Sequence, residues 1–306
     1  MKLLSRLFIR LFAIIIFLFN VGTYNTSLAQ DPEAGLPLPK PPAGLTDKCE
    51  KVRYILTHFW DAIDSIVIKS DDNAILEQTF ANYTYLMPLA CTDEIKKESI
   101  NMLVAKSNAN PEMQEQLIEI ATDYLRNYDS PMRNDALYVE IASAFIDKAN
   151  LDDTQKSRLE YGKKMASLNL PYTQANDFTF TDINNCLSSL YQNTGTSFTL
   201  LLFYDADCNE CRGTMNELQN SVLVNTLLTD KKLRIVAICI EGDEQDWHNL
   251  VSLLPSSWTH GYNDSLYLDN ELYEFRGIPS IYILEEDNTV LQRDINIKEA
   301  LSTLQR

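Results

Sequence analysis

The chain has 306 residues, of which 26 are Lys or Arg and 43 are Asp or Glu, so its net charge is −17. This length favours two domains, at about 150 residues each. The acidic balance disfavours nucleic acid and anionic membrane surfaces as partners, because both would repel the chain. Glycine is scarce, and no GxGxxG or phosphate-binding GxxxxGK pattern occurs, so no nucleotide cofactor is expected.

Residues 1–29 have the pattern of a secretory signal peptide. A short uncharged apolar run follows three basic residues (Lys2, Arg6 and Arg10), and small residues precede a cleavage point at Gln30. Cleavage would change the net charge from −17 to −20. We therefore expect a periplasmic protein in an oxidising compartment, where disulfides persist. If the signal is retained, the protein would instead be tethered to the membrane.

Three further segments follow. Residues 30–45 contain five prolines and are predicted to be an extended linker that packs no core. Residues 46–168 repeat apolar positions every three or four residues, which predicts about six helices in an all-α domain. Residues 171–306 alternate short apolar runs with helical stretches, which predicts an α/β domain.

The sequence of the α/β half predicts the order of its strands and helices. Three buried strands are expected at 199–204, 234–240 and 280–284, with an antiparallel edge strand at 289–294. Helices are expected at about 209–224, about 244–254 and 298–304.

A Cys-x-x-Cys pair, Cys208 and Cys211, stands where the first strand meets a helix. At a helix N-terminus, unpaired N–H groups and the helix dipole stabilise a thiolate, which suits Cys208 as a nucleophile. Cys211 lies one turn later on the same face, within reach to resolve a mixed disulfide. The alternatives are a static disulfide and half of a zinc site. Zinc would need two further ligands, and no second Cys-x-x-Cys or histidine pair is present, so no metal is expected.

Pro279 stands immediately before the third strand, a position that strands tolerate. A cis Ile278–Pro279 bond would bring the Ile278 backbone against the cysteine pair. Ile278 and Pro279 are therefore the predicted substrate-binding residues.

With these motifs, residues 171–306 resemble the TlpA/ResA-like group of bacterial periplasmic thiol–disulfide oxidoreductases. The resemblance implies a thioredoxin-like fold with a central mixed sheet, redox activity at Cys208 and Cys211, and a cis-proline at Pro279. Trp247 and the stretch 255–262 resemble that group's variable insertion. The whole chain resembles an arrangement in which a helical domain of unknown function precedes such a domain.

The chain departs from the thioredoxin pattern around the cysteines. Leu202 stands where many thioredoxins bury an acidic residue, and Asp207 stands where they have tryptophan. Asp205, Asp207 and Glu210 bring negative charge close to the thiols, which opposes thiolate formation. We expect these carboxylates to offset the effect of the helix dipole on Cys208 and to give the pair a reducing potential.

The remaining cysteines and the histidines are predicted to be structural. Cys239 ends an apolar strand and is expected in the core, and Cys186 is expected to be buried and free in a helix-like stretch. Whether Cys49 and Cys91 pair is left open, because sequence spacing does not show whether they meet. His58 is expected to pack with the aromatic residues after it, and the other two histidines (His248 and His260) are expected at the surface.

The function that these observations favour is reduction of protein disulfides in the periplasm. The expected partners are disulfide-containing envelope proteins and a membrane electron donor, with no cofactor. One alternative is a non-catalytic envelope binding module on a thioredoxin-like scaffold. A less favoured one is a thiol peroxidase, which needs a peroxidatic cysteine three residues after a threonine.

Overall fold

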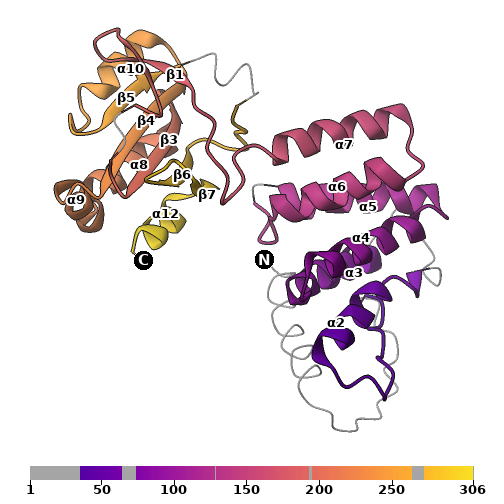
Figure 1. Cartoon of the computed structure of the whole chain (residues 1–306). Helices are drawn as coiled ribbons and strands as arrows, with labels where there is room; N and C mark the ends of the chain where they lie inside the picture. The colour runs from indigo at the N-terminus through magenta and orange to yellow at the C-terminus, as the bar shows by residue number, and fades with distance from the viewer. Residues whose placement is uncertain (1–34, 64–73, 128, 193–194, 264–271, 306) are drawn as a thin grey trace.

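The computed structural model describes residues 35–63, 74–127, 129–192, 195–263 and 272–305. The predicted signal peptide and the start of the proline-rich segment lie outside these residues. A stack of helices stands beside an α/β domain (Figure 1), which confirms the predicted two-domain fold class. In the part of the chain that is described, no helix is both long enough and apolar enough to span a bilayer.

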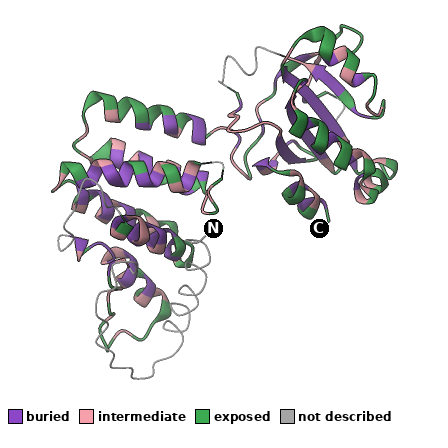
Figure 2. Ribbon diagram, turned by 180° about the vertical axis from the view of Figure 1, so that it is seen from behind, coloured by how far each residue is buried: buried purple, intermediate pink, exposed green. Residues whose placement is uncertain are grey.

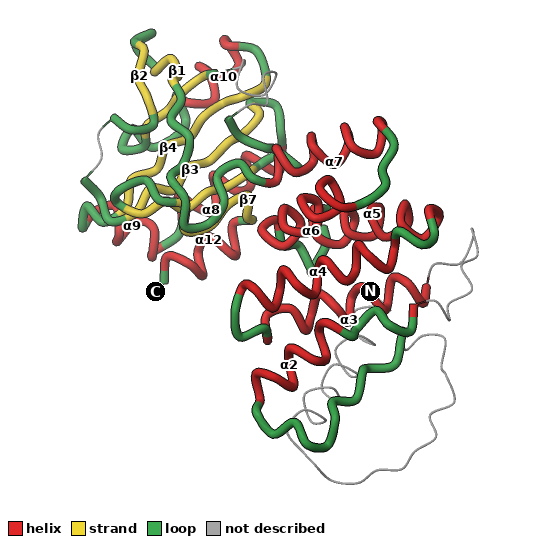
Figure 3. Tube along the Cα trace, turned by 45° about the vertical axis from the view of Figure 1, so that its right-hand side comes forward, coloured by secondary structure: helices red, strands yellow, loops and turns green. Residues whose placement is uncertain are grey.

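The described part of the helical domain contains six α-helices and one short 3-10 helix. They are α2 (Lys48–Thr57), α3 (Ala74–Leu86), η3 (Met87–Leu89), α4 (Asp93–Ser107), α5 (Pro111–Arg126), α6 (Asp135–Lys148) and α7 (Asp153–Ala166). Local sequence explains where they begin: Asn110 caps α5 by accepting two backbone N–H groups, and Pro111 occupies its first turn. Figures 1 and 3 show the helices stacked in chain order, with α6 and α7 nearest the α/β domain.

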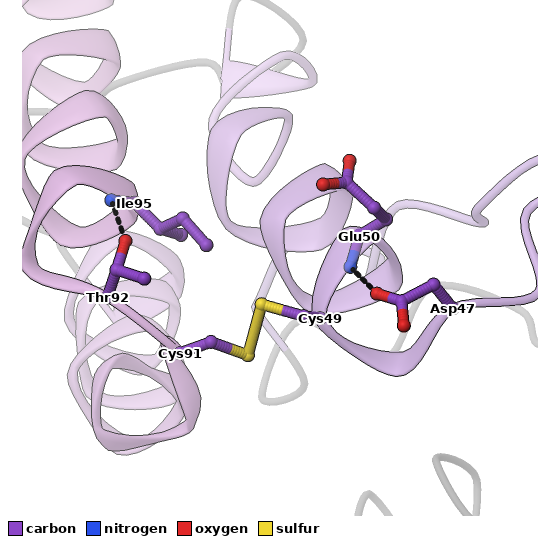
Figure 4. The surroundings of a disulfide bond; sticks show 6 residues. All are labelled: Asp47, Cys49, Glu50, Cys91, Thr92 and Ile95. Atoms are coloured by element: carbon purple, nitrogen blue, oxygen red, sulfur yellow. Dashed lines mark hydrogen bonds between the residues drawn. A yellow bond between two sulfur atoms is a disulfide. The ribbon is translucent and has the colours of Figure 1, made fainter.

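A disulfide joins Cys49 to Cys91 and so settles a pairing that the sequence leaves open. Cys49 lies in the first turn of α2, and Cys91 directly precedes Thr92, which caps α4. The two Cα atoms are 5.9 Å apart across a sequence separation of 42 residues. Figure 4 shows the bond between these two helix starts, with Asp47 and Thr92 capping on either side.

The proline-rich segment does more than link, and this corrects one prediction. Leu36 is buried in the core of the helical domain, and its backbone N–H donates to Thr79 Oγ1 at 3.0 Å. An extended backbone leaves N–H groups free to bond, and a leucine between prolines can still enter a core. At least this part of 30–45 is therefore packed structure.

The α/β domain is built on a seven-stranded mixed sheet in the order β2-β1-β5-β4-β3-β6-β7. The strands are β1 (Thr179–Asp182), β2 (Leu187–Ser189), β3 (Phe198–Asp205), β4 (Leu233–Glu241), β5 (Thr259–Tyr262), β6 (Ser280–Glu285) and β7 (Val290–Ile295). The helices are α8 (Asn209–Asn220), α9 (Val222–Thr229), α10 (Glu244–Val251) and α12 (Ile297–Leu304). Strands β3, β4 and β5 run parallel, and β6 and β7 return antiparallel.

The two faces of the sheet are covered differently. Alternate residues of β3, including Leu200 and Leu202, pack under helices α8, α9, α10 and α12. The residues between them, including Leu201 and Phe203, pack against loop segments near Phe178 and Tyr273. Figure 2 shows the strands as buried (purple) and the outer surfaces of the helices as exposed (green). The cysteine pair belongs to the helix-covered face.

Three strands, β1, β2 and β5, were not predicted from the sequence. Strand β5 extends the central sheet between β4 and β1, so the stretch 255–262 is part of the sheet as well as a connection. Gly261 permits this close packing, because a Cβ there would lie 2.4 Å from the Phe180 ring and 2.7 Å from Ile238 Cδ1. Residues 187–189, expected to be helix-like, form the edge strand β2.

Candidate active site

The turn from β3 into α8 places the two cysteines. Cys208 is the N-cap residue of α8, and its Sγ accepts the backbone N–H of Cys211 at 3.1 Å. The sulfur therefore takes the position that an Asn, Asp or Ser oxygen takes at other helix starts. An N–H group and the positive end of the helix dipole both point at the atom that would carry negative charge during attack.

The two thiols differ in exposure. Cys208 is partly exposed, whereas Cys211 is fully buried against the core of the α/β domain. Burial raises the pKa of the Cys211 thiol well above its ordinary value, and the hydrogen bond with Cys208 raises it further, whereas a hydrogen bond with the Asp205 backbone lowers it in part. Cys208 can therefore meet a macromolecular substrate, and Cys211 can meet only Cys208.

Ile278 and Pro279 lie at the same end of the sheet as the cysteines. Strand β6 begins at Ser280, which pairs with Phe203 near the end of β3. The residues just before Ser280 are thereby placed beside the β3–α8 turn, and Ile278 packs against the same core cluster as Cys208. The Ile278–Pro279 peptide bond is cis.

The three predicted carboxylates are not equivalent. Asp205 is half-buried and accepts the N–H of Asp207 at 2.8 Å. It acts on the pKa of Cys211 in two opposed ways, because its backbone lowers that pKa by hydrogen bonding and its charge raises it. The Asp207 side chain is 68% exposed and lies 3.9 Å from Arg212, and Glu210 is exposed in the first turn of α8. Of the three, Asp205 is the one that acts on Cys211, and a pKa-tuning role for all three stays a prediction.

Sequence reasoning assigned no role to a group of buried residues behind the cysteines. Tyr204, Cys239 and Trp247 lie in the same core cluster as Cys211, and Tyr204 pairs with Cys239 across β3 and β4. Burial raises the pKa of Cys239 to about 12, and the charges of Asp205 and Asp207 add to the effect. The alternation of side chains along β3 could have predicted that Tyr204 lies on the same face as Leu202, since the two residues are two positions apart.

The structure confirms one of the predictions for the other cysteines and histidines and corrects the rest that follow. Cys239 is buried as predicted, but Cys186 is exposed, because it lies at the tip of the hairpin between β1 and β2. His260 is buried in β5, with Nε2 3.0 Å from the carbonyl oxygen of Pro255. The prediction of a surface position was wrong because the strand that contains His260 was missed. His58 is partly buried, and it stacks on Tyr54, which precedes it, whereas the prediction was packing with the aromatic residues after it.

A thiol peroxidase needs a free cysteine three residues after a threonine. Thr46 does stand three residues before Cys49, so spacing alone does not remove this alternative. The structure places Cys49 in the helical domain, bonded to Cys91 and outside the α/β domain that contains the Cys208–Cys211 pair.

The described residues offer no cluster of three or more His, Cys, Asp or Glu side chains that could hold a metal ion.

Comparison with known families divides the chain in two. Residues 195–290 match the family described as thioredoxin-like, and residues 21–169 match the family described as a domain of unknown function (DUF5106). The C-terminal domain is thus a thioredoxin-like domain. The protein is a two-domain chain in which a DUF5106 helical domain precedes it.

One solved structure has the same fold over most of this chain, and others match parts of it. A thioredoxin-like protein from Bacteroides caccae is 24% identical, with a TM-score of 0.76 over 88% of this chain and 97% of that chain. The C-terminal domain of an uncharacterized protein from Bacteroides fragilis is 29% identical, with a TM-score of 0.43 over 45% of this chain and 99% of that chain. The thioredoxin domain of a thiol-disulfide oxidoreductase from Bacteroides vulgatus is 20% identical, with a TM-score of 0.38 over 44% of this chain and 96% of that chain. No curated protein matches the chain.

Proposed function

We propose that the protein is a thiol–disulfide oxidoreductase that reduces protein disulfides through Cys208 and Cys211. One observation supports this most directly. The partly exposed Cys208 sulfur caps α8 and accepts the Cys211 N–H, while the Cys211 thiol is buried directly behind it. This is an arrangement of one attacking and one resolving thiol.

The reaction balances as a two-electron exchange. The Cys208 thiolate attacks one sulfur of the substrate disulfide, the substrate S–S bond breaks, and the other substrate sulfur leaves as a thiolate that takes up a proton. Cys211 then loses its proton and attacks Cys208 Sγ, which forms the Cys208–Cys211 disulfide and releases the second substrate thiol. An external dithiol donor must return two electrons to the protein before the next cycle.

The Ile278 backbone beside Pro279 would pair with an extended substrate segment in the manner of a β-strand. Such pairing uses main-chain groups, so it accepts many sequences. The proposed substrates are disulfide-containing envelope proteins, and the proposed donor is a membrane reductant. The periplasmic location rests on the predicted signal peptide.

The proposed direction is reductive. Asp205, Asp207 and Glu210 bring negative charge close to the helix N-terminus that Cys208 caps, and this charge opposes the favourable effect of the helix dipole on a thiolate there. A dithiol pair is a strong oxidant when its reduced form is stabilised as a thiolate. Negative charge near the thiols opposes the thiolate and therefore favours a reducing potential. A measured potential as oxidising as about −120 mV would overturn this part of the proposal.

Insulin reduction tests the function. The wild-type protein should precipitate insulin in the presence of dithiothreitol, Cys208→Ser should be inactive, and Cys211→Ser should accumulate a mixed disulfide. Cys186→Ser is the matched control, because Cys186 is a free cysteine outside the site. A wild-type protein that leaves insulin intact, with a pair that stays oxidised in cells, would instead favour the non-catalytic binding module.

A further inference from the structure

Seven charged side chains gather where the two domains meet. The helical domain contributes Arg126, Arg133 and Asp135, and the α/β domain contributes Glu274, Arg276, Arg293 and Asp294. No side chain of this domain-interface cluster is more than 19% exposed, and that of Asp294 is 0% exposed. Charges buried to this degree keep their places only when each is paired.

The first half of the cluster holds the chain just before Ile278. Arg276 Nη2 donates to Asp135 Oδ1 at 2.5 Å and to Glu274 Oε2 at 2.7 Å. Asp135 is the first residue of α6, and Arg126, the last residue of α5, pairs with Glu274. Residues 274–276 are therefore bound to two helices of the other domain.

The second half holds the chain just after Pro279. Ser280 Oγ donates to Asp294 Oδ1 at 2.9 Å. Arg133 of the helical domain donates from Nη2 to the backbone carbonyl of Asp294 at 2.8 Å, and its Nη1 lies 3.5 Å from the Asp294 carboxylate. Both flanks of the Ile278–Pro279 pair are thus connected to the segment 133–135.

We propose that the helical domain positions the substrate-binding segment 276–280 relative to Cys208, with Asp135 and Arg133 as the positioning residues. This proposal rests on the proposed function, since the place of Ile278 matters only if a substrate chain pairs there. Misplacing a reacting group by about 1 Å can cost about 100-fold in rate. The thiols themselves are held by β3 and α8, so their redox chemistry should not depend on the cluster.

The test compares Asp135→Asn with Asp153→Asn in the full chain. Both are the first residues of helices, but Asp153 is exposed at the start of α7. Asp135→Asn should lower kcat/KM for insulin about tenfold, mainly through KM. It should not change the rate of reduction of 2-hydroxyethyl disulfide, because that substrate has no backbone to pair with Ile278. It should also leave the reduction potential of the Cys208–Cys211 pair unchanged. Asp153→Asn should behave as wild type in all three measurements.

Amide hydrogen exchange gives a readout that does not need activity. Exchange within 274–280 should quicken in Asp135→Asn and not in Asp153→Asn. If Asp135→Asn does not fold, Arg133→Met takes its place, because the Arg133 side chain, 19% exposed, is the least buried of the cluster.

The outcomes separate the two proposals. Unchanged insulin kinetics and unchanged exchange would overturn the positioning role, and so would an equal loss with insulin and with 2-hydroxyethyl disulfide. If the wild-type protein reduces neither disulfide, the proposed function fails, and the exchange comparison alone decides whether the helical domain holds the segment.

Discussion

The four free cysteines occupy very different surroundings, so their alkylation rates test the roles given to them. Cys186 is exposed and Cys208 is partly exposed, whereas Cys211 and Cys239 are fully buried. We predict that iodoacetamide at pH 8 modifies the first two in the folded, reduced protein and spares the other two.

The size of the difference follows from ionisation. Burial raises the pKa of Cys239 from an ordinary value of 9.0 to about 12. At pH 8 the thiolate fraction then falls from about one in ten to about one in ten thousand, and only the thiolate reacts. Cys239 should therefore react about 1,000-fold more slowly than an ordinary thiol, before any steric protection is counted. The pKa of Cys211 is raised by the same cause, so it should be protected at least as strongly.

The assay is mass spectrometry of peptides after timed alkylation, with the Cys49–Cys91 bond left intact. In Cys186→Ser, Cys208 should be the single fast site among the described free cysteines. In urea above the unfolding midpoint, Cys211 and Cys239 should reach the rate of Cys186, which shows that the fold protects them. If either buried cysteine reacts within about tenfold of Cys186 in the folded protein, the reasoning from burial is wrong.

Three further predictions concern stability and can be measured by urea unfolding. Gly261→Ala should lower the free energy of unfolding by about 1–3 kcal/mol, because the new Cβ overlaps core atoms. Gly213→Ala, in open space on α8, should raise it by about 0.5–1 kcal/mol. A more stable Gly261→Ala than Gly213→Ala would contradict the packing described. Replacing Cys49 and Cys91 by serine opens a cross-link that spans 42 residues and should cost about 4 kcal/mol, and a loss below about 1 kcal/mol would refute that argument. Burial raises the pKa of Asp294 above its ordinary 3.8, so the stability it contributes is complete below that value and is lost as pH rises through the higher folded pKa. Asp294→Asn cannot ionise, so its stability relative to wild type should grow as pH rises above 4, and a pH-independent difference would contradict this sign.

The elements that hold the cysteines were predictable because their signals are local. The run 199–204 is continuously apolar and ends in a polar turn, so strand, turn and helix follow in order, and β3 and α8 lie where this pattern places them. The expected helix 209–224 breaks at Ser221, whose side chain caps a second helix, α9. Ser221 therefore ends α8 and begins α9.

The missed strands β1, β2 and β5 are three or four residues long and lack a strong pattern. Their strand conformation comes from pairing at one side of the sheet, which local propensity does not encode. His260 illustrates the consequence, because a histidine with no strand assigned to it reads as a surface residue. The burial of Leu36 escaped prediction for a similar reason, since its contacts lie more than forty residues away.

The domain-interface cluster could not be predicted either. Its members come from the segments 126–135 and 274–294, and charged residues are mostly exposed unless a fold pairs them. Arg276 is adjacent to the Gly277-Ile278-Pro279 motif in the sequence, but nothing near it indicates that its partner is Asp135, 141 residues earlier.

A cluster of this kind is a poor way to gain stability. Moving charges out of water costs several kcal/mol for each ion, and well-packed apolar residues can often replace such a cluster without loss. The raised pKa of Asp294 shows that, at this carboxylate, the cost of burial outweighs the attraction of Arg133 and Arg276. An apolar interface could have joined the domains, but it would have allowed them to slide. Guanidinium groups bind carboxylates in few geometries, so the cluster restricts how 133–135 can lie against 274–280. We therefore propose that the buried charges add specificity of placement, and the segment they contact leads to Ile278 and Pro279, at the end of the sheet where Cys208 lies.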